Sequence, residues 1–310
     1  MSQLTVGGIE ELLFADYPAA YAVADDRFGL FVGERAAAVS GVAFALDATV
    51  PMVRAAAGAG CNLLVTHHPP FWAAPRCFLS ADSAATADGA VIFWAARLGV
   101  AVLSMHTNVD CAPAAAQLLM AALGYTQESV IKPHLTILNG EQIGLGQLAR
   151  ATAPAACTLR QLGERCRAFF GGHPRVWGDP ERPVARLAVC SGAGSELVGA
   201  VVAARPDCYV TGELRHHEEV YLADEGIALI ELGHDCSELP YRQLMADSLL
   251  ARVAGEGLLG EPGKPGLSGE LEEPGGGSPG EPGLSGELGG GLKTVILEPT
   301  AQCWVAGLPD

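Results

Sequence analysis

The sequence predicts an α/β fold with largely parallel sheets. Apolar stretches with strand character alternate with stretches of helical character along most of the 310 residues. The helical stretches are long enough to form the crossovers that connect parallel neighbours in a sheet. The alternation breaks near residues 125–136 and then starts again. We therefore expect two α/β lobes, at about residues 1–128 and 129–255.

Each lobe is expected to contain one run of alternating elements. In the first run, helix 49–60 ends in glycine, and helix 112–124 carries Pro113 in its first turn, where a missing N–H is tolerated. The rest of the first run consists of strands at residues 29–34, 38–46, 61–68 and 100–107 and a helix at 84–99. The second run consists of helices at 158–172, 195–205, 217–226 and 241–255 and strands at 185–192, 207–213 and 227–234.

Residues 256–291 differ in composition from the rest of the chain. Residues 260–271 return in shortened form at 280–288, with glycine at every third position inside each block, as in collagen. A pair of glutamates and a run of three glycines break that register, so we expect a flexible, collagen-like acidic insertion and no triple helix. A strand-like stretch follows, and residues 292–310 are expected to close the fold.

The composition is typical of a globular protein from a reducing compartment. Hydrophobic residues make up 49% and charged residues 17% of the chain. The nine cysteines include no Cys-x-x-Cys pair, which indicates reduced thiols, several of them core residues such as Cys61 and Cys190. The N-terminus lacks the basic and apolar regions of a leader, so we expect a cytoplasmic protein. The net charge of −16 argues against nucleic acid or an anionic membrane as a partner.

Three predicted strands end in side chains that bind metal ions. In parallel α/β sheets, ligands collect at the carboxyl ends of the strands. Six nitrogen and oxygen donors at such an edge are too many for one tetrahedral zinc site with an open position, and they suit two divalent ions. The donors are His67 and His68, His106 and Asp110, and His234 and Glu238.

The adjacent histidines fit this interpretation. Pro69 and Pro70 end the strand and hold His67 and His68 in an extended geometry, so the two rings diverge toward different ions. Simpler interpretations exist for single residues. A lone histidine at a strand end is usually only hydrogen-bonded, Asp110 and Ser237 stand where helix N-caps are expected, and the neighbouring Cys111 and Cys236 are weaker ligand candidates.

Four motifs give the chain a resemblance to a known family. They are Thr-His-His-Pro at 66–69, His-Thr-Asn-Val-Asp at 106–110, Thr-Gly-Glu-Leu-Arg-His-His at 211–217 and Gly-His-Asp-Cys-Ser-Glu at 233–238. The chain resembles the NIF-three-like dinuclear metal-centre proteins, often labelled GTP cyclohydrolase 1 type 2 homologues, over most of residues 17–255. The resemblance implies a two-lobed, three-layer α/β subunit that forms a toroidal homohexamer, with two metal ions in the cleft between the lobes.

The resemblance also implies roles for particular residues. The six donors named above are the implied ligands, with Asp110 as the bridge. Independently of the resemblance, metal-binding histidines need a partner on their other nitrogen, so Glu213 or His217 is the expected proton shuttle or orienting group. Arg215 and His216 are the expected phosphate contacts; the alternative is that Arg215 and one of the histidines lie at the solvated start of a helix. Two departures stand out: Asp25 and Arg27 flank Asp26 where the family has Trp and Asn, and Gln147 replaces an arginine.

Two classes of function follow. The first is a metal-dependent hydrolase in which metal-activated water attacks a nucleotide or similar small anion such as GTP. The second is a non-catalytic metal-binding scaffold or a metal-handling, regulatory ring. The identity of the ions stays open among Zn, Mn, Fe, Co and Ni, since histidine and carboxylate sets accept all of them.

The glycine-rich segment 190–196 is either a phosphate cradle or a tight strand-to-helix turn, and the turn is the favoured interpretation.

Overall fold

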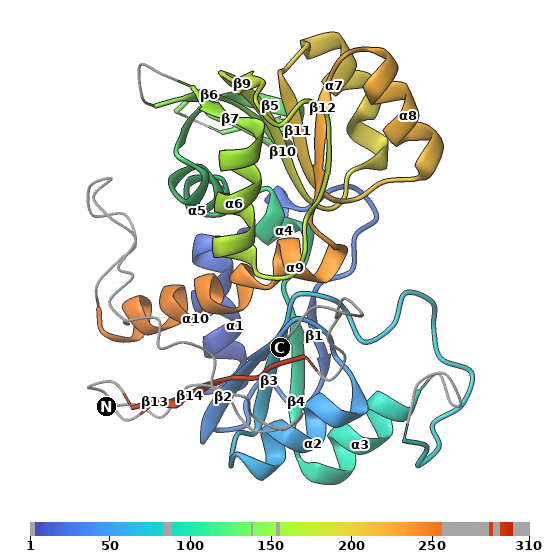
Figure 1. Cartoon of the computed structure of the whole chain (residues 1–310). Coiled ribbons are helices and arrows are strands. Elements are labelled where there is room, and N and C mark those ends of the chain that lie inside the picture. The colour runs from blue at the N-terminus through green and yellow to red at the C-terminus, as the bar shows by residue number, and fades with distance from the viewer. Residues whose placement is uncertain are drawn as a thin grey trace. The chain divides into compact units, whose positions relative to one another are not determined.

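The computed structural model divides the chain into two compact units (Figure 1). It describes residues 4–82, 89–137, 139–152, 156–255, 285–287 and 292–299. The first unit comprises Met1–Ala19, Ala24–His106 and Tyr241–Gln302, and the second comprises Ala20–Val23, Thr107–Pro240 and Cys303–Asp310. Each unit contains a six-stranded sheet and its own helices, which confirms the predicted α/β class.

The sheet of the first unit has the strand order β1-β4-β3-β2-β14-β13. Its four inner strands run parallel, whereas the two edge strands β1 and β13 pair antiparallel. The strands are β1 (Gly29–Val32), β2 (Gly41–Ala45), β3 (Leu63–Thr66), β4 (Ala101–Ser104), β13 (Ser285–Glu287) and β14 (Lys293–Ile296). The accompanying helices are α1 (Val6–Asp16), α2 (Val50–Gly58), α3 (Ala90–Leu98) and α10 (Pro240–Val253).

The first sheet is parallel because its inner strands are buried and joined by helical crossovers. All residues of β2, β3 and β4 are buried, as expected for strands covered on both faces. Thr49 caps the amino end of α2 by accepting a hydrogen bond from the Met52 N–H. The next helix, α3, ends at Gly99, whose left-handed conformation commonly terminates helices.

The sheet of the second unit has the order β5-β6-β10-β11-β12-β8, and only β10, β11 and β12 run parallel in it. The strands are β5 (Tyr125–Thr136), β6 (Gln142–Ala151), β8 (Arg175–Trp177), β10 (Arg186–Ala193), β11 (Cys208–Glu213) and β12 (Ala228–Glu231), and β7 (Cys157–Thr158) pairs separately with β9 (Pro183–Val184). The helices are α4 (Thr107–Asp110), α5 (Pro113–Leu123), α6 (Leu159–Phe170), α7 (Val198–Ala204), α8 (His216–Asp224) and α9 (His234–Glu238).

The predicted break between the lobes coincides with a strand. Residues 125–136 form β5, which pairs along its length with β6 in an antiparallel hairpin. Most of its side chains are exposed, so its sequence is polar and lacks the continuous apolar signal of a buried strand. The compact units divide after His106 and near Tyr241, whereas the predicted lobes divide after residues 128 and 255.

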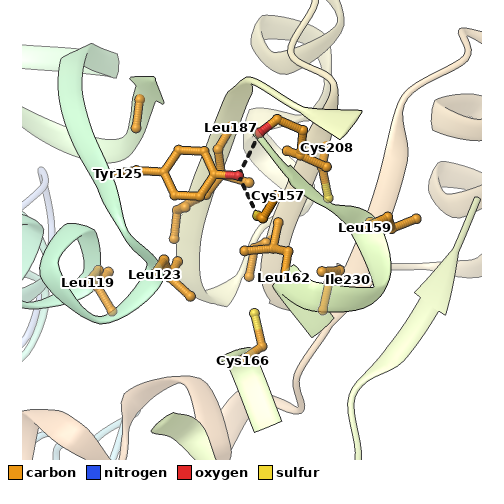
Figure 2. Close-up of a cluster of buried hydrophobic side chains, with 14 of the residues drawn as sticks. Leu119, Leu123, Tyr125, Cys157, Leu159, Leu162, Cys166, Leu187, Cys208 and Ile230 are labelled. Carbon is orange, nitrogen blue, oxygen red and sulfur yellow. Dashed lines mark hydrogen bonds between the residues drawn. The ribbon is translucent and has the colours of Figure 1, made fainter. Parts of the chain in front are cut away.

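Thiols contribute to the apolar core of the second unit (Figure 2). Cys157, Cys166 and Cys208 lie among leucines and valines there, and the Tyr125 hydroxyl donates to the Val184 carbonyl at 2.8 Å. Burial raises the pKa of the Cys166 thiol to about 12, so this side chain remains a neutral core group at physiological pH.

The chain returns to the first sheet at its carboxyl end. β14 pairs in parallel with β2, and Val295 and Leu297 enter the core between the sheet and its helices. The buried Arg242 of α10 donates to the Leu297 carbonyl. Within the predicted insertion, the structure describes only Ser285–Glu287, which pair with β14, so the expected flexibility of the remaining residues lies outside the described chain.

Candidate metal centre

Strand register brings three histidines together in the first unit. β3 and β4 are parallel neighbours, and Thr66 pairs with Ser104 at their carboxyl ends. The next residues of each strand therefore emerge level with one another. The His67 ring lies 5.1 Å from that of His68 and 5.2 Å from that of His106, and a possible ligand atom from each ring lies within 4.8 Å of the others.

Each of the three rings is held through its Nδ1 atom. The acceptor is the Met105 carbonyl for His67, at 3.0 Å. It is Asp47 for His68, at 2.8 Å, and Asp26 for His106, at 2.6 Å. A carbonyl or carboxylate oxygen only accepts hydrogen bonds, so the proton of each neutral ring lies on Nδ1 and the lone pair on Nε2. An acceptor on the nitrogen opposite the metal is what orients metal-binding histidines in proteins.

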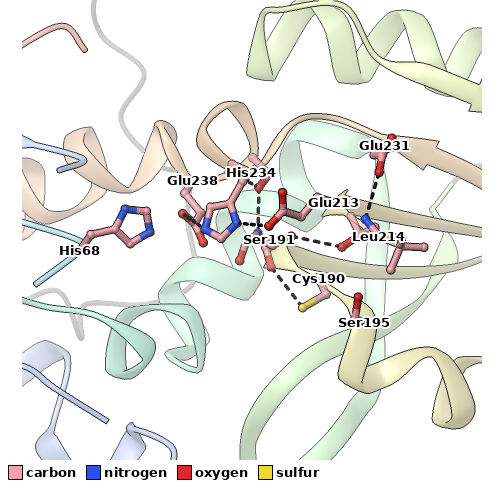
Figure 3. A network of polar contacts seen from close by, with 12 residues as sticks. His68, Cys190, Ser191, Ser195, Glu213, Leu214, Glu231, His234 and Glu238 are labelled. Carbon is pink, nitrogen blue, oxygen red and sulfur yellow. Dashed lines mark hydrogen bonds and ion pairs between the residues drawn. The ribbon is translucent and has the colours of Figure 1, made fainter. Parts of the chain in front are cut away.

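A second cluster forms at the carboxyl ends of β10, β11 and β12 in the second unit (Figure 3). His234 and Glu238 stand four residues apart on α9, which places both on one face of the helix. His234 Nε2 lies 3.3 Å from Glu238 Oε2, while its Nδ1 lies 2.9 Å from Glu213 Oε1. The backbone of β11 sets the level of Glu213, because the Gly233 N–H donates to the Gly212 carbonyl.

Asp110 belongs to this second cluster. One of its oxygens lies within 4.8 Å of a Glu238 oxygen, and its Oδ1 accepts a 2.7 Å hydrogen bond from the Ser191 hydroxyl. It does not cap the following helix, since α5 begins after Ala112 with no side-chain cap. Ser237 is not an N-cap either: it lies inside α9 and accepts from the Gly192 N–H.

The glycines of segment 190–196 serve close packing. Gly192 has φ of 60°, and a Cβ atom there would collide with the Glu238 carboxylate. The N–H groups of Gly192 and Gly194 donate to Ser237 Oγ and the Glu213 carbonyl. Because these two N–H groups are engaged within the protein, the segment has the character of a tight turn and not of a phosphate cradle.

Charge in the second cluster favours a cation between the carboxylates. The hydrogen bond to Glu238 raises the pKa of His234 to about 9; burial opposes this effect and Glu213 adds to it. Nearby Asp110 and Glu238, together with burial as the main cause, raise the pKa of the Cys190 thiol. A positive charge is therefore stabilised where His234 contacts Glu238 and Glu213, whether it is a protonated imidazole or a bound cation.

The donor set fits divalent metal ions of the borderline and hard type. It consists of imidazoles and carboxylates, and carboxylates already contact the Nδ1 atoms of His68, His106 and His234. Among the described residues, the groups that could hold a metal contain no cysteine, so Cys111 and Cys236 are not members of these clusters.

The residues predicted to orient the ligands or to contact the substrate lie in two different settings. Glu213 is in direct contact with His234, as described above. His217 is exposed in the first turn of α8, next to Glu218. His216 contacts Glu219 at 3.0 Å, and Arg215 stands just before the helix.

Asp47 is not among the site residues predicted from the sequence, and Asp26 stands out there only because its two neighbours depart from the family motif. Asp47 comes two residues after β2, and Ala45 at the end of β2 pairs with Thr66 at the end of β3. Asp47 therefore stands level with His68. The signal was a carboxylate just past a buried strand, which is the same pattern that identified the ligand candidates. Asp26 precedes β1 in a loop, where no periodic pattern marks it.

The fold and these clusters define an α/β protein with histidine and carboxylate groups of the kind that bind metal ions. A family model described as Duf34/NIF3 (NGG1p interacting factor 3) matches residues 4–258, and the chain belongs to this family. A Streptomyces coelicolor protein named GTP cyclohydrolase 1 type 2 homolog is 35% identical over 243 residues, which cover 76% of this chain and 82% of that protein. A Clostridium acetobutylicum protein of the same name is 27% identical over 226 residues, covering 72% of this chain and 81% of that protein.

Solved structures share the fold. A Bacillus cereus protein related to NIF3 superposes with a TM-score of 0.73 at 21% identity, covering 83% of this chain and 95% of that one. A hypothetical protein from Staphylococcus aureus superposes with a TM-score of 0.68 at 20% identity, covering 82% and 92%. In the part of this chain that the structure describes, no helix is both long and apolar enough to span a membrane.

Proposed function

We propose that the protein is a metal-dependent hydrolase that uses two divalent ions, held by the six ligands His67, His68, His106, Asp110, His234 and Glu238. The observation that carries this proposal is the set of three clustered histidines, each with Nδ1 bound to an acceptor. A cluster of histidines that only stabilised the fold would not need every ring to present the same nitrogen. Asp110 would supply a carboxylate to these ions, and its two oxygens can each act as a ligand atom.

When bound, such ions lower the pKa of water toward neutrality and polarise the bond under attack. The residues of the chain then have distinct tasks. Asp26, Asp47 and Glu213 orient the histidines and increase their basicity. Glu213, more than half exposed, also lies where it can exchange a proton with solvent, and His217 is the proposed second acid–base group.

The proposed substrate is a small anion, with a nucleotide such as GTP as the leading candidate. The names of the curated relatives support this choice, since both are called GTP cyclohydrolase 1 type 2 homolog. We further propose that the protein forms a homohexamer in the cytoplasm. Light scattering on the purified protein tests the assembly directly, and a monomeric mass would contradict it.

The first experiment measures bound metal per chain by elemental analysis. The wild-type protein is expected to contain close to two ions after reconstitution with Zn, Mn or Fe, and the His67→Ala/His234→Ala double variant is expected to lose them. A wild-type protein that binds none of these metals would contradict the proposed function as a whole.

The second experiment measures turnover of GTP by the metal-loaded protein. His217→Ala is expected to lower kcat while the metal content stays unchanged. Glu213→Gln is expected to lower kcat and also to weaken metal binding, because Glu213 orients His234. His134→Ala is the matched control for His217, because His134 is an exposed histidine on β5 that belongs to neither cluster of candidate ligands. Full metal content without turnover would favour the alternative, a non-catalytic metal-binding scaffold or metal-handling, regulatory ring, which the family description as an interacting factor also suggests.

A further inference from the structure

An exposed tryptophan lies against one of the candidate ligands. The Trp72 ring centroid is 5.1 Å from that of His106, and the two planes meet at 67°, an edge-to-face arrangement. Trp72 nevertheless has 57% of its surface exposed, whereas only 15% of the His106 side chain is exposed. The indole therefore borders the histidine cluster and still presents apolar surface to solvent.

The preceding residues anchor Trp72 in this place. Pro69 and Pro70 are buried directly after His68 and restrict the backbone. Phe71 packs edge-to-face against Phe31 of β1, with ring centroids 5.3 Å apart. Two fixed prolines and an anchored phenylalanine leave little freedom to the residue that follows, so the position of the indole is set by the same segment that supplies His67 and His68.

An exposed tryptophan at this position lowers the stability of the fold but provides a surface on which a ring can stack. An indole is among the largest apolar surfaces a protein has, and exposing it forgoes burial energy that the fold would otherwise gain. Its flat, electron-rich surface stacks on heteroaromatic rings, and such stacking contributes about 1–3 kcal/mol per base in nucleic-acid complexes. A phosphate or other anionic group bound at metal ions and a ring stacked on Trp72 together describe a nucleotide.

We propose that Trp72 is the platform on which the planar heteroaromatic ring of the substrate stacks. This inference rests on the proposed function, because it places the ring next to substrate groups held at the metal ions. It adds the residue that recognises the ring, so that the protein binds an anion that carries a flat ring in preference to the same anion without one. Trp72 then determines specificity and takes no part in the chemical step.

The test compares two probes on metal-loaded protein by calorimetry. Guanosine 5′-monophosphate and ribose 5-phosphate carry the same phosphate and sugar, and only the first has a ring to stack. In Trp72→Ala, the affinity for guanosine 5′-monophosphate is expected to fall about tenfold, in line with the loss of one stacking contact. The affinity for ribose 5-phosphate is expected to stay within about twofold, and Trp72→Phe is expected to recover most of the nucleotide affinity.

Phe78→Ala is the matched control, because Phe78 is a similarly exposed aromatic residue of the same segment, at 54% exposure. It is expected to change neither affinity. The proposal is overturned if Trp72→Ala binds guanosine 5′-monophosphate as tightly as the wild type, or if it loses both probes equally. Metal content measured on the same samples separates the two hypotheses. If the protein holds its metal and Trp72→Ala leaves the affinity for guanosine 5′-monophosphate unchanged, the stacking proposal is refuted and the proposed function is not. If the wild-type protein holds no metal, the proposed function itself is refuted.

Discussion

At the scale of single residues, the acceptors on the histidine Nδ1 atoms decide what the cluster can do. His68 and His106 each contact a carboxylate, and His67 contacts a backbone carbonyl. A carboxylate acceptor fixes the ring orientation and makes the opposite nitrogen a better donor to a metal. Asp26 is almost fully buried, so its hydrogen bond to His106 is shielded from water and correspondingly strong.

Replacing Asp26 is therefore expected to weaken metal binding. Asp26→Ala should lower metal affinity roughly 10- to 100-fold, which is the usual effect of removing such a partner. The control is Asp25→Asn, which removes the same charge one residue away and keeps a side chain that tolerates the left-handed φ of 62° at this position. Competition titrations with a metal indicator measure both variants. Equal losses would show that net charge, and not the hydrogen bond to His106, sets the affinity.

Gly192 provides a second test at the residue scale. Gly192→Ala places a methyl group against the Glu238 carboxylate and forces a left-handed conformation on an L-residue, so we expect loss of stability and displacement of Glu238. Gly199→Ala is the control, because a Cβ atom there meets nothing within 4 Å in helix α7. That variant should be neutral or slightly stabilising. Metal analysis and urea unfolding of the two proteins test the expectation, and similar behaviour of both would contradict it.

At the scale of elements, the site depends on strands that end at the same level. Thr66 pairs with Ser104, and Thr211 pairs with Glu231, so short segments beyond these pairs meet in space although they are far apart in sequence. A slip of register would turn each side chain to the other face of the sheet. The buried strands that fix the register therefore matter to the site as much as the ligands themselves.

The carboxyl-terminal strand β14 should contribute measurably to the first unit. Val295 is buried and its neighbour Ile296 is half-buried on the other face of the strand. Val295→Ala is expected to reduce the free energy of unfolding by about 2 kcal/mol, and Ile296→Ala by less, although the isoleucine loses more atoms. Urea denaturation compares the two variants. A larger loss for Ile296→Ala would contradict the burial of Val295 on the core-facing side of β14.

At the scale of the whole molecule, bound metal should stabilise the folded chain. A ligand that binds only the native state adds stability that grows with the logarithm of its concentration over Kd, about 4 kcal/mol at a thousandfold excess. Chelation is therefore expected to lower Tm by roughly 10 °C for a chain of this size, and added metal should restore it. The His67→Ala/His234→Ala protein is the control and should respond to neither treatment. An unchanged Tm in the wild type would contradict a site that couples metal to folding.

Sequence patterns located the ligand candidates but not all their partners. His67 and His68 were visible because they follow a continuous apolar strand and precede two prolines. Asp47 shows the same pattern in a weaker form, as a single carboxylate just after a strand, and its contact with His68 was not predicted. The β5–β6 hairpin was missed because its exposed strand is polar, so its residues resemble a linker.

What the sequence by itself determined is the α/β class and the set of candidate metal-binding residues, because burial of strands and donors at strand ends are local patterns. The tertiary structure alone decided the partners of those residues: Asp26 with His106, Asp47 with His68, Glu213 with His234, and Ser191 with Asp110. Each of these pairs joins residues separated by 21 to 81 positions in the chain. Such contacts depend on strand order and register, which no local pattern encodes.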